Sequence, residues 1–463
     1  MSDAVFGAVF GAESKGDTPE ERAQTSGTRF VRSQHQLSIW SPGASGRWLS
    51  AREALRTFGW EVLRELASRS ATPLVRSNAE PTQTVLAQID ALGLDQKKAF
   101  DTVALSKDEV VALKSGRQVP FRKLERLAQN LSLEPDRLGI EAQAGADTRL
   151  GFRLRSMGAT EAKLSAAAVL ALAEAAWVIR KQLELSQRLG ETNELGGFVP
   201  DGDYGGSLTP AWRAGFRLAN ATRELLGIGH SEPIESMTRL LEERLGVPVI
   251  HVELPTSFAG ATIANGEARG IVVNFHGKNE HVWVRRMTMA HELGHFLWDP
   301  SERLNRLVVD SYGEIEADFQ TRNDPVEQRA NAFAVEFLAP REELGDVFLK
   351  ARNQLEAVET VMQRFGIGRA ASVYHLQNLL HGVAIKPGHI AIEPDQSLMG
   401  REEISVSLFK PADVPISRRG RFAVLVGRAF NRSLISEDTA GALLGCPPAQ
   451  TAQALDWIAS IDS

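Results

Sequence analysis

The residues with the clearest chemical potential form one short run, His291-Glu292-Leu293-Gly294-His295. In a helix, side chains four positions apart lie on one face, so both imidazoles could bind a single zinc ion. Glu292 is offset by one position and can reach a metal-bound water instead. Zinc lowers the pKa of such a water toward about 7, and Glu292 can pass its proton to a leaving amine. The run therefore indicates zinc-dependent hydrolysis of a peptide bond.

The surroundings of this run matter because the HExxH pattern also occurs by chance in amphipathic helices with surface histidines. Here the remaining face of the helix is apolar, with Met289, Phe296 and Leu297, and the whole chain contains only 10 histidines. This context favours the metal-binding interpretation.

A catalytic zinc site needs a third protein ligand and one open position. Helix geometry favours Glu327, because Asp324 and Pro325 are typical of a helix start, and the helix that follows is rich in small and apolar residues. A carboxylate on a buried helix needs a partner, and zinc would be one. The alternative is a capping box, in which Glu327 bonds to the helix N-terminus. Other downstream acids that could supply the ligand are Asp310, Glu314, Glu316, Asp318 and Glu336.

The chain resembles the ImmA/IrrE family of metallopeptidases in two separated stretches, VWVRRMTMAHELGHFLWDP and PVEQRANAFAVEFLAP. The similarity covers about residues 208–345. It implies a core similar to thermolysin-like peptidases, one zinc ion per chain bound by His291, His295 and Glu327, and Glu292 as general base and acid. Asp299 stands where many members of the family have a histidine. Several members act on transcriptional repressors, often of the helix-turn-helix kind.

Other side chains with chemical potential give less specific signals. Tyr312, His375 and His381 could stabilise the oxyanion, but each is more typical of a structural or surface residue. Cys446 could cap the zinc as a redox switch, although a lone cysteine is more often a small buried apolar residue.

Short β-branched runs precede the HExxH helix, at residues 247–252, 261–264 and 268–274, separated by Gly, Pro and Asn. They predict a small sheet, whereas most of the chain has helical periodicity. We therefore expect an α+β, mostly helical fold. Its zincin-like core would combine the small sheet, the HExxH helix and the second ligand helix, and a helix-turn-helix module would precede it.

Residues 82–140 predict several short helices, and from Leu94 to Gly139 the chain resembles an XRE-type helix-turn-helix domain. The recognition helix would lie at about residues 107–114 and would enter the major groove of DNA. This stretch has nine Lys and Arg against seven Asp and Glu, a net charge of +2. Because that charge is weak for DNA binding, a protein-docking or dimerising role is the alternative. Candidate DNA contacts are Lys107, Lys114, Arg117 and Arg122.

Composition narrows the classes of protein to consider. The 463 residues suggest about three domains. A net charge of -6 excludes a chain that is basic throughout and binds nucleic acid by charge alone. One cysteine excludes disulfides within the chain and suits a reducing cytoplasm. We expect neither a secretory signal nor a membrane span, because the N-terminus lacks a basic start before an apolar stretch and the most apolar run, residues 164–179, is short.

The predicted order of segments has five parts. They are a disordered arm and helix (1–80), the XRE-type helix-turn-helix (82–140), a long helix and linker (150–207), the zinc metallopeptidase domain (208–345), and a helical or mixed regulatory domain (346–463).

The expected function is that of a cytoplasmic regulatory zinc metalloendopeptidase that cleaves a partner protein, a helix-turn-helix repressor above all. DNA is a second candidate partner, and an oligomer is compatible with the sequence. Two alternatives are a DNA-binding transcription regulator whose peptidase-like domain acts as a sensor without turnover, and a helical scaffold with a structural zinc.

Overall fold

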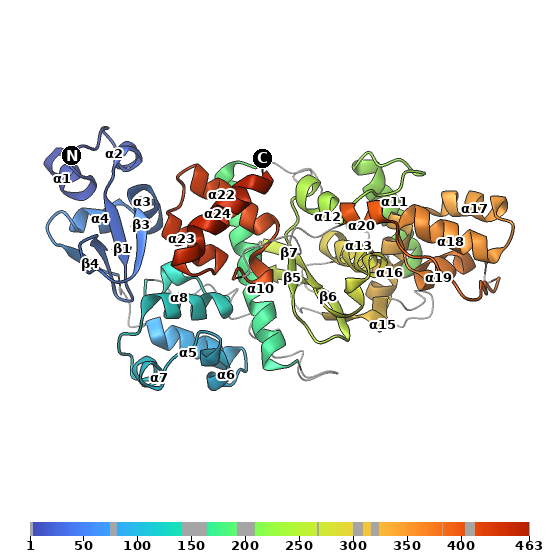
Figure 1. Cartoon of the computed structure of the whole chain (residues 1–463), viewed down its shortest axis with the longest axis horizontal. Coiled ribbons are helices and arrows are strands. Elements are labelled where there is room, and N and C mark those ends of the chain that lie inside the picture. Colours follow the sequence, from blue (N-terminus) through green and yellow to red (C-terminus); the bar gives the residue numbers. More distant parts are fainter. Residues whose placement is uncertain are drawn as a thin grey trace. The chain divides into compact units, whose positions relative to one another are not determined.

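The computed structural model of the chain describes residues 3–74, 81–140, 164–191, 209–265, 268–299, 309–315, 324–381, 383–402 and 413–462. The chain divides into two compact units. The first unit combines residues 1–191 with residues 409–463, and the second comprises residues 192–408. Each unit contains many helices and one four-stranded sheet (Figure 1), so the expected α+β, mostly helical fold is confirmed.

The first unit begins with an antiparallel sheet of strand order β3-β1-β2-β4, which packs with four short helices around a common apolar core. This corrects the disordered arm expected within the segment 1–80, as far as residues 3–74 are described, whereas the helical part of that expectation is met by the helices between residues 51 and 65. The strands have only three or four residues each, so alternation of apolar side chains could not stand out from the Gly- and Ser-rich composition. The elements are α1 (Asp3–Phe10), α2 (Pro19–Thr25), β1 (Arg29–Arg32), β2 (Gln36–Ile39), β3 (Arg47–Ser50), α3 (Ala51–Phe58), α4 (Trp60–Glu65) and β4 (Ala71–Pro73).

The several short helices expected between residues 82 and 140 are present. Ser106 caps the third of them, α7, and Glu109 returns the hydrogen bond to the Ser106 backbone, which explains why an acidic residue occupies this position. The elements are α5 (Pro81–Ala91), α6 (Gln96–Asp101), α7 (Lys107–Lys114), α8 (Phe121–Asn130) and the 3-10 turn η1 (Pro135–Arg137).

The C-terminal helices belong to the first unit. The predicted long helix, α10 (Ala166–Leu189), packs against α22 (Arg421–Asn431), and the rings of Trp177 and Phe422 meet edge to face at 6.3 Å. The linker expected up to residue 207 lies outside the described residues. Because the apolar face of α10 is covered by residues more than 200 positions later, the predicted 346–463 domain is wrong. The remaining elements are η5 (Ile416–Arg418), α23 (Glu437–Leu444) and α24 (Pro448–Asp462).

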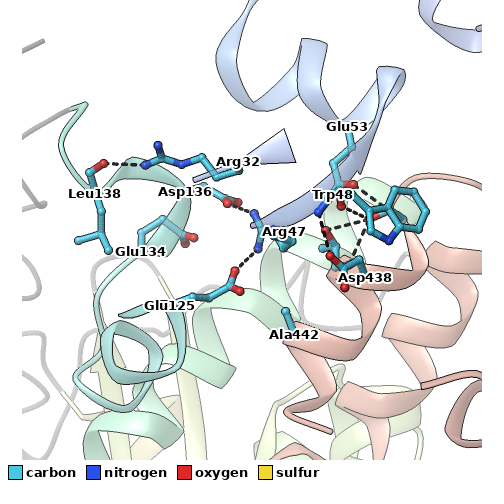
Figure 2. A network of polar contacts seen from close by, with 12 residues as sticks. Arg32, Arg47, Trp48, Glu53, Glu125, Glu134, Asp136, Leu138, Asp438 and Ala442 are labelled. Atoms are coloured by element: carbon cyan, nitrogen blue, oxygen red, sulfur yellow. Dashed lines mark hydrogen bonds and ion pairs between the residues drawn. The ribbon is translucent and has the colours of Figure 1, made fainter. Parts of the chain in front are cut away.

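A buried polar network joins three parts of the first unit (Figure 2). Arg47 in β3 pairs with Glu125 on α8 and with Asp136 in η1. Asp438 on α23 accepts a hydrogen bond of 2.8 Å from the backbone N–H of Trp48. Because a buried charge without its partner is costly, these contacts hold the N-terminal sheet, the short helices and the C-terminal helices together.

The second unit is built on the predicted small sheet. Strands β5 (Val249–Val252), β6 (Phe258–Asn265) and β7 (Ala268–Asn274) match the three β-branched runs, and β8 (Val309–Ser311) was not expected. The strand order is β5-β7-β6-β8, with β5 and β7 parallel and the other pairs antiparallel.

One long helix lies against this sheet and a second lies against the first, and together they carry the candidate site. Helix α13 (Val282–Trp298) packs against β6, β7 and α16 (Pro325–Leu338), and α16 packs against α11 (Ala211–Leu225). No described helix combines the length and apolar character that crossing a membrane requires.

The helices after residue 345 continue the same core. Val358, Val361 and Leu376 are fully buried in one cluster with residues of α13 and α16. The predicted boundary at residue 345 is therefore wrong. These elements are α17 (Arg341–Lys350), α18 (Gln354–Phe365), α19 (Arg369–Leu379) and α20 (Gln396–Arg401).

A buried ion pair fixes α13 at its N-terminal end. Arg286 pairs with Glu402, and both side chains are fully buried. Glu402 also accepts a hydrogen bond of 2.6 Å from the backbone N–H of Met237, at the start of α12 (Met237–Arg239). The C-terminal end of α20 is thus tied to the helix that carries the HExxH motif.

Candidate metal centre

Three side chains from two helices converge in the second unit. The Nε2 atoms of His291 and His295 on α13 lie 3.0 Å apart, and Glu327 Oε2 on α16 lies 3.4 and 3.6 Å from them. All three side chains are buried. Two imidazoles and a carboxylate match the donors of catalytic zinc sites, so this set is compatible with a metal ion. Within the described ranges, no other three such side chains come together in this way.

The sequence explains why α13 and α16 can approach so closely. A Cβ atom on Gly294 would lie only 3.0 Å from the ring of Phe333, so a larger residue would force that ring to move, and glycine favours the close crossing. Asp324 caps α16 by accepting a hydrogen bond of 2.9 Å from the backbone N–H of Val326. Glu327 lies one residue further on, buried beside the two histidines, which favours the ligand interpretation over the capping box.

Each imidazole also has a side-chain contact at its other ring nitrogen, Nδ1. His291 Nδ1 lies 2.8 Å from Asn331 Oδ1, and His295 Nδ1 lies 2.8 Å from Asp299 Oδ2. Asp299 pairs in turn with Arg329. When Nδ1 donates in this way, the lone pair of each ring resides on Nε2, which is the atom that faces Glu327.

The sequence had marked Asp299 only as a departure from the family pattern and had not singled out Asn331. The spacing of both residues from a ligand could have identified them. Asp299, the C-cap of α13, follows His295 by four positions, and Asn331 follows Glu327 by four, so each lies about one helical turn from a ligand.

The carboxylates in and beside the cluster favour a bound cation. Burial lowers the pKa of His295, but the Asp299 and Glu327 carboxylates outweigh it and raise that pKa well above its usual value. Burial raises the pKa of Glu327, but the two imidazoles outweigh it and hold that pKa well below its usual value. Glu327 is thus ionised, and an incoming metal ion must displace a proton from His295.

Glu292 lies between α13 and the sheet. Its Oε2 accepts a hydrogen bond of 2.7 Å from the hydroxyl of Thr262 on β6. A Cβ atom on Gly260 would lie 3.0 Å from Glu292 Oε1 and 2.7 Å from the carbonyl oxygen of Val272, so β6 needs glycine where it passes this carboxylate. No sequence pattern points to Thr262, because its contact with α13 arises only from the tertiary fold.

Comparison with known families agrees with this geometry. The family model described as Peptidase_M78, the IrrE N-terminal-like domain, matches residues 243–377. The matched stretch contains His291, Glu292, His295 and Glu327, so this part of the chain is a metallopeptidase-like domain. It begins and ends later than the 208–345 expected from the sequence. No curated protein matches the chain.

Two of the three residues considered for stabilising the oxyanion, Tyr312 and His375, form hydrogen bonds with backbone groups of the metallopeptidase-like domain. The Tyr312 hydroxyl donates to the carbonyl oxygen of His276 at 2.9 Å and accepts from the backbone N–H of Asn279 at 3.0 Å. His375 Nε2 lies 2.9 Å from the carbonyl oxygen of Ala339, and burial lowers its pKa to about 4, so it is neutral at pH 7. The third candidate, His381, is exposed. These positions suit structural and surface residues.

Two further sequence candidates, Glu336 and Cys446, do not join the cluster. Glu336 is buried on α16, where it pairs with Arg341. Cys446 is buried in the first unit with its Sγ 3.7 Å from the Thr451 hydroxyl, and burial raises its thiol pKa. The structure describes no side chain for the remaining acids, Asp310, Glu314, Glu316 and Asp318.

The candidate DNA contacts belong to the first unit, whereas the metal cluster belongs to the second. Lys107 and Lys114 are exposed at the two ends of α7, and Arg117 is exposed just after it. Arg122 is also exposed, but it pairs with Asp438 at 2.5 Å within the first unit. The first three therefore present charge to solvent, and the fourth also serves the fold.

Proposed function

We propose that the metallopeptidase-like domain is a cytoplasmic zinc-dependent endopeptidase that cleaves a partner protein, chiefly a transcriptional repressor of the helix-turn-helix kind. The observation that carries this proposal is the convergence of His291, His295 and Glu327 beside Glu292. The similarity to the IrrE N-terminal-like domain supports it, because the matched residues include all four.

The chain's own groups have distinct tasks in this chemistry. A bound zinc ion would lower the pKa of a water molecule and polarise the scissile carbonyl. His291, His295 and Glu327 would hold the ion. The Glu292 carboxylate would accept a proton from the attacking water and deliver it to the leaving amine, and the Thr262 hydrogen bond would keep that carboxylate oriented.

The experiment combines metal analysis with cleavage. The full chain, purified without chelators, should contain one zinc ion, and it should cut a repressor encoded beside its own gene at a defined bond. Glu292→Gln should retain the zinc and lose the cut, because it removes only the proton carrier. A wild-type protein without bound zinc would overturn the proposal.

A second candidate function is a DNA-binding regulator in which the metallopeptidase-like domain senses a signal without turnover. The observation in its favour is that Lys107, Lys114 and Arg117 are exposed on or just after α7. In that case Glu292→Gln would regulate normally, whereas Lys107→Glu with Lys114→Glu would abolish operator binding in a gel-shift assay.

A further inference from the structure

A broad hollow lies on the second unit, and none of the metal-centre residues lines it. Its volume is about 1170 Å³, and its lining residues come mainly from α11, the start of α17 and the end of α19. Figure 1 labels these three helices. Sites for small molecules typically measure about 300–1,000 Å³. The hollow, called the α11 groove below, therefore suits a length of extended chain better than a compact ligand.

The charge of the α11 groove is positive. Three arginines line it, Arg213, Arg217 and Arg341, against one lining acid, Glu224. Arg341 also pairs with the buried Glu336, so the net charge of these five side chains is +1. Arg213 and Arg217 are exposed and four positions apart on α11, so they lie on the same helix face. Because the chain as a whole carries a net charge of -6, this is a local concentration of cations. The groove thus favours an anionic partner.

Aromatic rings hold two of these cations in place. The rings of Trp212 and Phe216 pack edge to face at 5.6 Å. The guanidinium of Arg213 lies 5.0 Å from the centre of the Trp212 ring, and that of Arg341 lies 4.0 Å from the centre of the Phe216 ring. Side chains already ordered in this way lose less entropy when they bind.

Two amide side chains add a donor and an acceptor. Asn220 donates to Glu336, while its buried Oδ1 has no hydrogen-bond partner among the described residues. The buried Nδ2 of Asn378 likewise has none within the same ranges, and both residues line the groove. Because these two atoms are buried, the exposed arginines are the groups that a bound segment would reach first.

We propose that the α11 groove binds an acidic segment of the protein substrate. Its Asp or Glu side chains would contact Arg213 and Arg217. The proposal rests on the proposed function, because only a peptidase of this kind has a protein substrate to position. It adds a recognition site separate from the residues that cut.

The test measures binding without turnover. Fluorescein-labelled hexaglutamate is titrated with the full chain carrying Glu292→Gln, and anisotropy reports binding. Adding Arg213→Glu and Arg217→Glu should weaken binding at least ~10-fold, because two attractive charges become repulsive. The matched control adds Lys350→Glu and Arg352→Glu, whose side chains are 79% and 84% exposed on the same unit, and should change binding less than ~2-fold.

Two results would overturn the groove proposal. Equal weakening by both pairs of substitutions would show that the peptide responds only to overall charge. Tighter binding of ATP than of hexaglutamate, with ATP displacing the peptide, would assign the groove to a small phosphate-bearing ligand instead.

The same data separate the two proposals. A protein that holds zinc and cleaves its partner but does not bind hexaglutamate would remove the groove proposal alone. A zinc-free protein that still binds hexaglutamate through Arg213 and Arg217 would support peptide recognition by the groove and overturn the endopeptidase.

Discussion

Two buried polar clusters, one in each unit, have different roles although both combine basic side chains with carboxylates. In the first unit Arg47 is surrounded by Glu125 and Asp136, so a cation and its anions all come from the chain (Figure 2). In the second unit the Nε2 atoms of His291 and His295 and the Oε2 atom of Glu327 face one another, as the ligand atoms of a metal site would. The comparison shows that the orientation of the potential metal-binding atoms indicates a reactive site better than the burial of charged groups does.

The two clusters also differ in what they connect. The Arg47 cluster joins a strand to helices about 80 to 90 positions later, and its role is to hold the fold. The histidine cluster joins two helices about 30 to 40 positions apart, and the contacts behind its rings orient ligands. Substitutions in the first should therefore change stability, and those in the second should change metal affinity.

The largest effect should follow from Arg47→Met. Removing one partner of a buried ion pair leaves uncompensated charge, so the first unit should lose about 3–5 kcal/mol of unfolding free energy. Urea unfolding of the full chain measures this, and metal content should stay unchanged. Arg64→Met is the matched control, because Arg64 is 53% exposed where it pairs with Glu61 and should cost less than ~1 kcal/mol. Equal costs would refute the structural role of the cluster.

Glu327→Gln should come next. The amide keeps the size of the side chain but loses the charge that faces two imidazoles, so zinc affinity should fall by more than ~100-fold, beyond the usual effect of an outer contact. Competition with a chelator measures the affinity. Glu336→Gln, on the same helix and equally buried, should leave it within ~3-fold. A comparable loss in both variants would contradict the assigned ligand.

A smaller effect is expected from Asp299→Asn. The carboxylate accepts the Nδ1 hydrogen bond of His295, and losing such a contact typically costs about 10–100-fold in metal affinity. The NMR titration of His295 in the metal-free protein should also move to lower pH, because Asp299 raises its pKa. An unchanged titration would argue against an orienting role.

The smallest effect is expected in the dependence of zinc affinity on pH. The pKa of His295 is raised in the folded protein, so below that pKa a proton occupies the site that zinc needs. Affinity should therefore rise about tenfold per pH unit until the pKa is passed. Calorimetry in buffers of different ionisation enthalpy should count about one proton released per zinc ion. Affinity that is constant between pH 6 and 8 would contradict this.

The sequence could predict the parts of the site that local geometry fixes. His291 and His295 share a face in any helix, and Asp324 with Pro325 placed Glu327 near a helix start. Thr262 could not be found, because its contact with Glu292 depends on how β6 packs against α13.

The fold was predictable to a similar degree. The short helices and the three β-branched strands follow from periodicity over single segments. The N-terminal sheet was missed, because strands of three or four residues carry little pattern. The domain boundary was missed for another reason. The apolar face of α10 gives no sign that its partner, α22, comes after the entire second unit.

That discontinuity has a consequence for biosynthesis. The second unit is complete at residue 408, whereas the first still lacks residues 409–463. At about 5–20 residues per second, the ribosome needs roughly 10–50 s to proceed from α10 to α22. During this interval Trp177 and its apolar neighbours lack their contact with Phe422, so the nascent chain exposes an apolar helix while the unit with the metallopeptidase-like domain is already folding.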